Sequence, residues 1–508
     1  MKSTLLVILL LAGACTVPPR PALTLAPNVG VIPENTLPDP VESLARRLMD
    51  QLEQRGYQVA RGYFKLYTKE DCDASYAVMG TCFGNNPAAP YVMPVMPSWP
   101  DEWVDPATIG AFGSTAACYS VSFRFAPREA IVILGLLPPP AKYFGLQTYL
   151  ATRQGDYKKD SPQYKYVETL GPDALNMLFT YVPDNPDRIE IFGTLSNSIN
   201  NVVIERQSGA AFDQLRFFII TPDQLMDHAV REALSSISVA GKDIFTEPIP
   251  SNMSIGLDEA ADDFTTWIRY AMPLDAGAAR PRSDAWRDEL PLVVLRIRDV
   301  RTEPQPVAYP PVVLEQRTAA QNPSEIDLLP DLINLVQAVC QKWGQPCDDA
   351  DPQASEQRPP YFANRQVPPI MFVGPDCTDA GMNCLADNLD TVYYISSQVP
   401  VDDQRVYAVV GVLSTQTGNA TYVGLGLNAS ARKLGFDNVS DDELTGSADA
   451  YGTAVADPDK FFVYYFARDC AGLEPLTAKY CRSVPEAVLP TCNPEDPDCD
   501  ILSFSLRG

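Results

Sequence analysis

The sequence predicts an α+β fold of two lobes, each built mainly of antiparallel β-sheet with a few capped helices and cross-linked by local disulfides. Short apolar runs bounded by Gly, Pro and Asn predict strands along most of the chain, whereas helical periodicity is confined to three segments. A proline-rich stretch at 301–325 separates these elements into two groups. The twelve cysteines fall largely into closely spaced pairs, which is typical of a chain that folds in an oxidising compartment.

The first predicted helix begins with Asp39 as its cap, followed by Pro40, which suits a first turn, and Glu42, which completes a capping box. Its apolar face comprises Leu44, Leu48 and Leu52, and it ends near Gly56. The strands expected next are 57–67, 119–125, 130–137, 142–151, 188–194, 214–220, 263–271 and 291–298. The intervening segment 83–103 contains too many prolines for a regular helix or strand.

A second helix is expected from Thr221-Pro222-Asp223, with Asp223 placed to cap it. Its apolar stripe comprises Met226, Val230, Leu234 and Ile237. A third helix is expected between Pro330 and Trp343, with Gly344 as its stop. The remaining strands are predicted at 391–397, 405–413, 419–427 and 460–467.

The domain organisation follows from these elements. We expect a signal peptide at 1–14, a proline-rich tether at 15–40, an N-terminal α+β domain at 41–300, a linker at 301–325 and a C-terminal disulfide-rich α+β domain at 326–508. Three segments of the first half resemble three of the second in the same order: 131–137 and 408–413, 141–146 and 420–425, and 213–219 and 457–463. An internal duplication would produce this order. Apolar strands resemble one another easily, however, and coincidence is the alternative.

The N-terminus predicts export. Lys2 precedes an unbroken apolar run at 5–11, and Ala-Gly-Ala then stands immediately before Cys15, which is the layout of a secretory signal. The same order resembles the bacterial lipobox, although Ala12 stands where Leu is preferred. We therefore expect a lipid on Cys15 that anchors the chain in a membrane of the cell envelope, and Thr16 in place of Asp favours the outer membrane. Cleavage of the same bond without lipidation, giving a secreted or periplasmic protein, is the main alternative.

Close spacing predicts disulfides between neighbouring cysteines. The candidates are Cys72 with Cys82, Cys340 with Cys347, Cys377 with Cys384, Cys470 with Cys481, and Cys492 with Cys499. A zinc site is the competing interpretation, but the short Cys clusters and histidines typical of zinc are missing from the sequence. If Cys15 carries a lipid, eleven cysteines remain and one stays unpaired, for which Cys118 is the expected candidate.

The composition of the chain limits which partners, catalytic residues and metal ligands we expect. A net charge of −25 argues against a nucleic-acid partner. The chain has a single histidine, His228, which lies off the apolar stripe of its predicted helix, so we assign no catalytic residue and no metal ligand. Calcium is the one cofactor that the acidic loops 71–73, 348–351 and 495–498 would suit, although none has EF-hand spacing. A hydrolase that uses a pair of carboxylates needs no histidine and stays open as an alternative.

Two groups of side chains are candidates for a binding surface. The irregular segment 83–103 carries Tyr91, Trp99 and Trp103, and one face of the strand at 142–151 carries Tyr143, Gln147 and Tyr149. Aromatic and polar side chains together suit a glycan or an envelope protein, but the same residues can also pack inside the protein's own core. The sequence therefore favours an exported, lipid-anchored envelope protein with a non-catalytic role in binding or assembly. The hydrolase, acting on polysaccharide, is the alternative.

Overall fold

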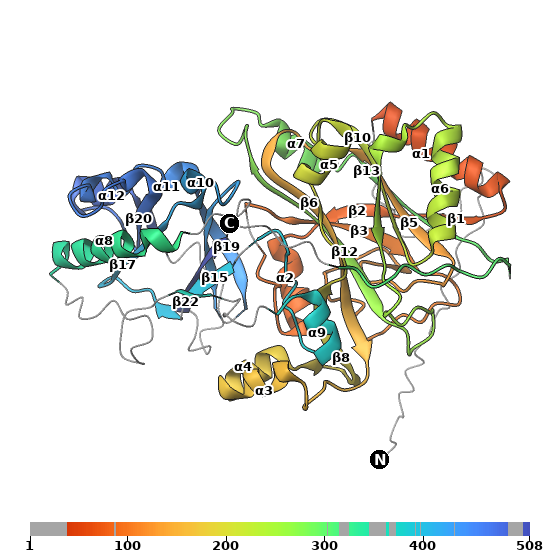
Figure 1. Cartoon of the computed structure of the whole chain (residues 1–508), viewed down its shortest axis with the longest axis horizontal. Coiled ribbons are helices and arrows are strands. Elements are labelled where there is room, and N and C mark those ends of the chain that lie inside the picture. Colours follow the sequence, from red (N-terminus) through yellow and green to blue (C-terminus); the bar gives the residue numbers. More distant parts are fainter. Residues whose placement is uncertain are drawn as a thin grey trace, which may run out of the picture.

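The computed structural model describes residues 38–507 except 86–87, 302, 314–324, 345–361, 365–371, 392, 397, 431 and 486–500. It contains two lobes, with the N-terminal lobe on the right of Figure 1 and the C-terminal lobe on the left. Each lobe combines helices with two sheets that are mostly antiparallel, which confirms the predicted α+β class. No helix in this described part of the chain is long and apolar enough to cross a membrane.

The first lobe is built from two sheets with a core between them. The smaller sheet has the order β1 (Gln58–Arg61), β13 (Leu292–Arg298), β5 (Glu129–Leu136), β10 (Leu215–Thr221) and β11 (Ile244–Pro248). The larger has the order β2 (Tyr63–Leu66), β3 (Tyr91–Pro97), β12 (Asp263–Pro273), β6 (Ala141–Gln154), β8 (Asn185–Thr194) and β7 (Tyr181–Val182), with β4 (Tyr119–Ser120) beside β3 and β9 (Ile199–Asn200) beside β6. Alternate residues of β5 and β6, such as Ile133 and Leu146, fill the core between the sheets.

Helices cover the outer face of the smaller sheet. Leu48 of α1 (Asp39–Gln54) and Val230 of α6 (Gln224–Ser236) pack with Val132, which points away from the inter-sheet core. The other helices of this lobe are α2 (Lys69–Met79), α3 (Pro162–Thr169), α4 (Pro172–Leu178), α5 (Asn201–Ser208) and α7 (Arg282–Glu289). Burying alternate residues of β5 on both faces explains why its sequence is apolar after Glu129.

The second lobe repeats this design with fewer strands. One sheet has the order β14 (Phe362–Asn364), β15 (Tyr393–Ser396), β22 (Ile501–Arg507), β18 (Gly424–Ala429) and β19 (Leu434–Ser440), with β16 (Val399–Pro400) beside β22. The other has the order β17 (Val406–Val412), β20 (Phe461–Ala467) and β21 (Cys481–Ser483). The helices in this half of the chain are α8 (Leu329–Lys342), α9 (Gly374–Ala380), α10 (Ser414–Thr417), α11 (Asp441–Leu444) and α12 (Pro475–Lys479), of which α9 packs on the first lobe. Leu335 and Val339 of α8 pack against Val463 on the outer face of the smaller sheet.

The three predicted helices are present as α1, α6 and α8. Asp223 caps α6 as predicted by accepting the Leu225 amide, whereas Asp39 is the first helical residue of α1 and Pro38 holds the cap position. The expectation that 83–103 lacks regular structure is wrong, because Tyr91–Pro97 forms the buried strand β3. Strand β12 pairs only with Tyr91 and Val92 of β3, so Pro94 lies beyond that ladder and no amide is missed there.

The boundary between the lobes is less simple than a linker at 301–325. Cys377, Ala380 and Met382 from α9 and its following turn belong to the core between the two sheets of the first lobe. The C-terminal half of the chain therefore contributes a segment to the N-terminal core.

Three predicted disulfides are present: Cys72–Cys82, Cys377–Cys384 and Cys470–Cys481. Cys118 and Cys340 are also disulfide-bonded, and none of the eight described cysteines is free. The expectation that Cys118 is the unpaired cysteine is therefore wrong. Cys15, Cys347, Cys492 and Cys499 lie outside the described residues. Each disulfide closes a loop of about ten residues, worth about 2–3 kcal/mol in the chain-entropy model.

The two lobes share one topology. The order β2-β3-β12-β6-β8 corresponds to β14-β15-β22-β18-β19, and β5-β10-β11 corresponds to β17-β20-β21. Every corresponding pair of strands runs in the same relative sense, including the parallel pairs β10 with β11 and β20 with β21. Helices α2 and α9 also correspond, since each ends at a left-handed glycine (Gly80, Gly381) and carries the first cysteine of a local disulfide. An internal duplication accounts for all of these matches.

Strand pairing fixes which residues of the two lobes correspond. Gly145 lies opposite Arg269 and Gly424 opposite Arg507, as the match of 141–146 with 420–425 requires. The third sequence match also holds, because Phe218 and Phe462 both face the core between their sheets. The first match is one residue out of register: Phe218 pairs with Ile133, whereas Phe462 pairs with Gly411 rather than Val410. Ala130, Val132 and Leu134 therefore correspond to Ala408, Val410 and Val412.

The lobes meet through contacts that come in reciprocal pairs. The turn after each disulfide helix bonds to the other lobe in the same pattern. The amides of Cys82 and Gly84 donate to the carbonyls of Arg432 and Lys433, and those of Cys384 and Ala386 donate to Ile191 and Phe192. Arg507 donates to the Gly84 carbonyl (3.0 Å) and Arg269 to the Ala386 carbonyl (3.5 Å). Tyr143 contacts its own counterpart, Tyr422, with ring centroids 5.9 Å apart. The interface is thus a pseudo-two-fold one, like that of a symmetric dimer.

Candidate functional site

The side chains predicted to form a binding surface lie almost entirely inside the protein. Tyr91, Trp99, Tyr143, Gln147 and Tyr149 are all buried. Trp103 is the exception, with 39% of its surface exposed. Five of the six predicted residues therefore contact other parts of the chain rather than solvent.

Tyr91 and Tyr149 enclose a buried cation. Both rings, together with that of Trp267, stack around the guanidinium of Arg269 at 5.3–5.6 Å from the ring centroids. In the second lobe, Arg507 lies over Tyr393 in the same way, with the guanidinium 5.9 Å from the ring centroid. These arginines also bond across the interface, so the aromatic side chains serve to join the lobes.

Gln147 belongs to a buried polar cluster around Glu247. The Glu247 carboxyl accepts hydrogen bonds from the Thr148 amide (2.7 Å), the Thr148 hydroxyl (2.6 Å) and Ser196 (3.1 Å). Burial raises the pKa of Glu247 to about 7, and it likewise raises the pKa of Glu190 to about 7 and of Asp387 to about 6. None of these three carboxyl groups lines a cavity described below, so their altered pKa values belong to the interior.

A second buried network joins the two sheets of the first lobe. Arg296 donates to Glu129 and Glu102, at 2.6 Å in each case, and Arg124 and Arg188 both pair with Asp263 at 3.3 Å. The hollow beside Glu102 and Asp263 has a volume of only about 10 Å³, too small for a ligand. These ion pairs stabilise the fold, and the hollow beside them is too small to hold a substrate.

An open cavity lies at the end of the smaller sheet of the second lobe, and we name it the β17–β20 cavity. Its volume is about 480 Å³. It is lined by the start of β17, the end of β20 and the loops beside them: Asp403, Gln404, Arg405, Val406, Ala467, Arg468, Asp469, Ala471, Gly472 and Leu473. The sequence patterns gave no sign of it, because its residues come from two loops about 65 positions apart that meet only through the pairing of β17 with β20.

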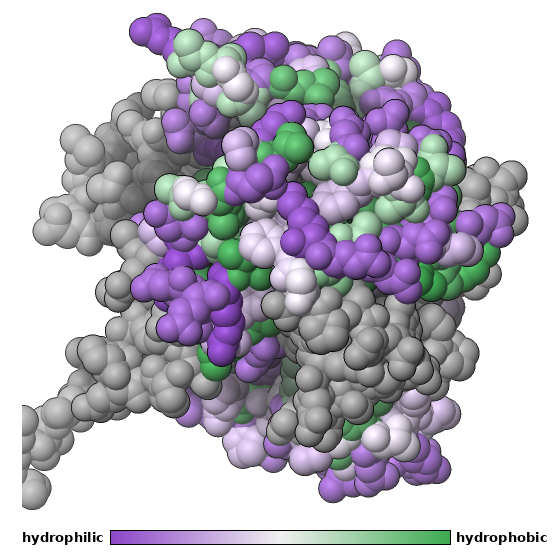
Figure 2. Space-filling view, turned by 90° about the vertical axis from the view of Figure 1, so that its left-hand side faces the viewer, coloured by the Kyte–Doolittle hydropathy of each residue, from purple (hydrophilic) through white to green (hydrophobic). Residues whose placement is uncertain are grey.

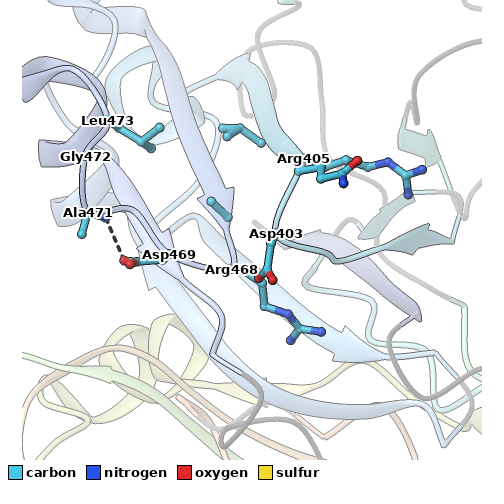
Figure 3. A pocket seen from close by; sticks show the side chains of 10 residues that line it. Asp403, Arg405, Arg468, Asp469, Ala471, Gly472 and Leu473 are labelled. Carbon is cyan, nitrogen blue, oxygen red and sulfur yellow. Dashed lines mark hydrogen bonds between the residues drawn. The ribbon is translucent and has the colours of Figure 1, made fainter.

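Figure 3 shows how the charged side chains are placed there. Asp403 and Asp469 face the hollow from two different loops, and the Arg405 side chain extends away from them. Asp469 accepts the Ala471 amide at 2.8 Å, and Arg468 donates to the carbonyls of Val401 (2.9 Å) and Val484 (3.2 Å). The cavity is therefore lined by two carboxylates, by two arginines (Arg405 and Arg468) and by a small apolar wall at Leu473.

In the first lobe the corresponding place is filled by the protein's own chain. According to the strand pairing, Val406 corresponds to Arg128 of the first lobe. Ala467 and Arg468 correspond to Asp223 and Gln224. There the Asp299 amide donates to the Arg128 carbonyl (2.9 Å), the Gln224 amide donates to the Val307 carbonyl (2.8 Å), and the Val307 amide donates to Asp223 (2.8 Å). The segment that follows β13 thus lies over the ends of β5 and β10, where the second lobe has its cavity.

The two lobes also differ in the pairing of the strand next to this place, which is β5 in the first lobe and β17 in the second. In the first lobe β5 lies between β10 and β13, whereas β17 pairs with β20 on one side and, among the described residues, with no strand on the other. Ala130, Val132 and Leu134 of β5 are 0% exposed; their counterparts are exposed at Ala408 and half-buried at Val410 and Val412. Figure 2 views the molecule from the left-hand side of Figure 1 and shows, among the described residues, apolar patches separated by hydrophilic residues rather than one apolar face. The open feature is therefore a strand edge with a cavity at its end.

The other sequence candidates do not form sites within the described chain. His228 is a surface residue that faces Glu232 on the same helix at 3.6 Å, and no group of three or more Asp, Glu, His or Cys side chains described here could hold a metal ion. The expectation of an acidic loop at 71–73 is wrong, because these residues lie in α2, where Asp71 bonds to Lys65 and Asp73 pairs with Arg432. The loops at 348–351 and 495–498 lie outside the described residues.

Comparison with known proteins identifies no family. No family model matches the chain, and no curated protein matches it. A solved structure from Vibrio parahaemolyticus, a structural-genomics target, has 10% identity and a TM-score of 0.30, over 92% of this chain and 94% of that one. A putative uncharacterised protein from Burkholderia cenocepacia has 9% identity and a TM-score of 0.33, over 92% and 82%. Likenesses this distant carry no argument about function.

Proposed function

We propose that this chain is an exported, lipid-anchored protein of the cell envelope that binds a protein partner at the second lobe and performs no catalysis. The observation that carries the proposal is the contrast between the lobes. The first lobe fills the place beside β5 and above its end with β13 and the segment that follows β13, whereas in the described part of the second lobe no strand pairs with the outer edge of β17 and a cavity lies at its end. A surface that one lobe covers with its own chain, and that the described residues of the other lobe leave uncovered, is suited to binding chain from elsewhere.

Export is supported by the leader sequence and by three local disulfides, which are consistent with an extracytoplasmic protein. Anchoring rests on Cys15. With a lipid on Cys15, Cys118 and Cys340 pair with two of Cys347, Cys492 and Cys499, and the third is a free thiol. Intact mass of the membrane fraction before and after thiol alkylation tests this arrangement. Added acyl mass with one alkylated cysteine supports it, and an unmodified Cys15 with no free thiol contradicts it.

The binding function is tested by placing a photo-crosslinking amino acid at Leu473, in the β17–β20 cavity, in cells that make the full chain. We expect a crosslink to one envelope protein. The same amino acid at Val202, which is 45% exposed on α5 of the first lobe, is the matched control. Replacing Ala471→Arg should fill the cavity and abolish the crosslink. A crosslink of equal yield from Val202, or none at either position, contradicts the proposal.

The second candidate function is a secreted or anchored hydrolase acting on polysaccharide through a carboxylate pair. It is supported by one observation, that Asp403 and Asp469 both line the β17–β20 cavity. The double replacement Asp403→Asn with Asp469→Asn should then abolish the release of reducing ends from envelope polysaccharide by the purified chain. No release by the unaltered protein argues against the hydrolase and leaves the binding function in place.

A further inference from the structure

We propose that the outer edge of β17 accepts an extended strand from another envelope protein, antiparallel to β17, in the position that β13 holds beside β5. This inference rests on the proposed binding function and specifies what the partner presents. The partner contributes a run of about six residues with apolar side chains at alternate positions, followed by polar residues that enter the β17–β20 cavity.

The first lobe supplies the geometry of such a complex. Strand β13 runs antiparallel to β5 over seven residues, from Leu292 opposite Gly135 to Arg298 opposite Glu129. Val293, Leu295 and Ile297 point to the core beneath α1, and Leu292 and Val294 point to the core between the sheets. A strand in the same position beside β17 would place its alternate side chains against Val410 and Val412 on one face.

The second lobe carries the surface that such side chains would cover. Helix α8 corresponds to α1, which buries Val41, Ala45, Leu48 and Leu52. In α8 only Leu335 and Val339 are buried. Leu329 is 45% exposed, and Ile326, just before the helix, is 65% exposed. An apolar strand inserted between α8 and the edge of β17 would bury this excess, at about 25 cal/mol for each Å² of apolar surface removed from water.

The β17–β20 cavity lies at the end of the outer edge of β17. Gln404, Arg405 and Val406 line the cavity and lead directly into β17. In the first lobe the chain leaving β13 is polar at this point, where Asp299 pairs with Arg128 over the end of β5. A partner chain leaving β17 in the same direction would meet Asp403 and Asp469 together with Arg405 and Arg468, so polar side chains that bond to both kinds of group suit its continuation.

The composition of β17 also favours an occupied edge. Its seven residues include no charge and no proline, the two devices that proteins commonly use to keep an exposed edge from pairing. A second copy of this chain is the competing occupant, because β17 could pair with itself. The proposal commits to a different protein, since the first lobe shows the edge filled by a strand of another sequence that continues over the cavity.

The test uses the purified full-length chain and a synthetic peptide with the sequence of residues 291–300, PLVVLRIRDV, as the probe. Hydrogen exchange is followed on the amides of 406–412. In an antiparallel edge, alternate amides point outwards without a partner and exchange rapidly. We expect saturating peptide to slow these amides at least about tenfold while leaving those of β1 unchanged. The same peptide with Pro in place of Leu295 loses a backbone donor and should not bind.

Two variants of the protein complete the test. Ala408→Lys places a charge on the exposed edge without filling buried space, and it should weaken peptide binding at least about tenfold. Val203→Lys, at a side chain of α5 that is 36% exposed, is the matched control and should leave binding unchanged. Peptide that binds without protecting β17, or equally to the Ala408→Lys variant, overturns the inference.

Two further outcomes separate the possible failures. If β17 is already protected in the free chain and light scattering shows a dimer that Ala408→Lys dissociates, the occupant is a second copy and the inference is overturned. If β17 exchanges rapidly and no peptide binds, the strand-acceptor role fails. The crosslink from Leu473 then reports separately whether the proposed binding function stands.

Discussion

Replacing Glu247 with Gln should stabilise the protein at alkaline pH and have much less effect on its stability at acidic pH. Glu247 is 1% exposed and faces no basic side chain among its hydrogen-bond partners, which are Gln147, Thr148 and Ser196. Thr148 also bonds to Thr266, at 2.9 Å between hydroxyl oxygens. A Gln side chain fits this cluster as the protonated acid does, because its carbonyl accepts the Thr148 amide and its NH₂ can donate to the Thr148 hydroxyl.

The expected change in the free energy of unfolding follows from the pKa of Glu247. Burial raises the pKa of Glu247 from its ordinary value of 4.5 to about 7 in the folded chain. The folded state is therefore favoured while the carboxyl is protonated, and stability falls as pH rises from about 4.5 through 7. Above that range the charged carboxyl costs about 3 kcal/mol, a cost that Glu247→Gln removes.

Urea unfolding of both proteins at pH 5 and pH 8.5 measures the effect. The variant should be more stable by about 3 kcal/mol at pH 8.5 and by less than about 1 kcal/mol at pH 5, where most of the folded chain holds the carboxyl protonated. The difference between the two proteins cancels the titration of Glu190 and Asp387, which are present in both. Equal stability at both pH values, or a variant that is less stable at pH 8.5, would refute the reasoning.

Three further predictions follow from the same structure. Arg296→Leu leaves Glu129 and Glu102 buried without their shared cation, and it should lower the free energy of unfolding by about 3–5 kcal/mol; Arg298→Leu, in the next but one position of β13 and paired with the exposed Asp101, should cost less than about 1 kcal/mol. Replacing Cys377 and Cys384 together with Ser should cost about 2–3 kcal/mol in urea unfolding, and an unchanged midpoint would contradict the role given to this disulfide. Asp387→Asn should lower the free energy of unfolding at pH 4 by about 1–3 kcal/mol, because one Asp387 oxygen accepts the Thr194 amide and the other the Gly374 amide, and an Asn NH₂ can accept neither; an unchanged urea midpoint at pH 4 would contradict this role.

Local features of the sequence were predicted well because their causes are local. The helices α1, α6 and α8 and three disulfides over short loops depend on residues within a few positions of one another, although of the two predicted side-chain caps only Asp223 of α6 is present. The repeated order of apolar segments indicated the shared topology for the same reason, although strand pairing was needed to correct one match by one residue.

Burial and pairing depend on distant residues and were not predictable in this way. The alternation in 142–151 correctly separated two faces of β6. It could not reveal that the face with Gln147 and Tyr149 is covered by other parts of the chain. Likewise Pro94 discouraged a strand at 91–97, because the sequence does not show how far the neighbouring strand extends. The β17–β20 cavity became visible only by comparing one lobe with the other.

The pseudo-two-fold arrangement has a consequence for how this molecule can change over evolutionary time. In a dimer of identical chains, any substitution that opens a strand edge opens it twice, and any segment that covers it covers it twice. Here both copies lie in one polypeptide, so each can accumulate its own substitutions. One lobe can therefore keep its strand edge covered while the other lobe keeps a strand edge uncovered. Two identical subunits cannot diverge in this way, because every substitution occurs in both.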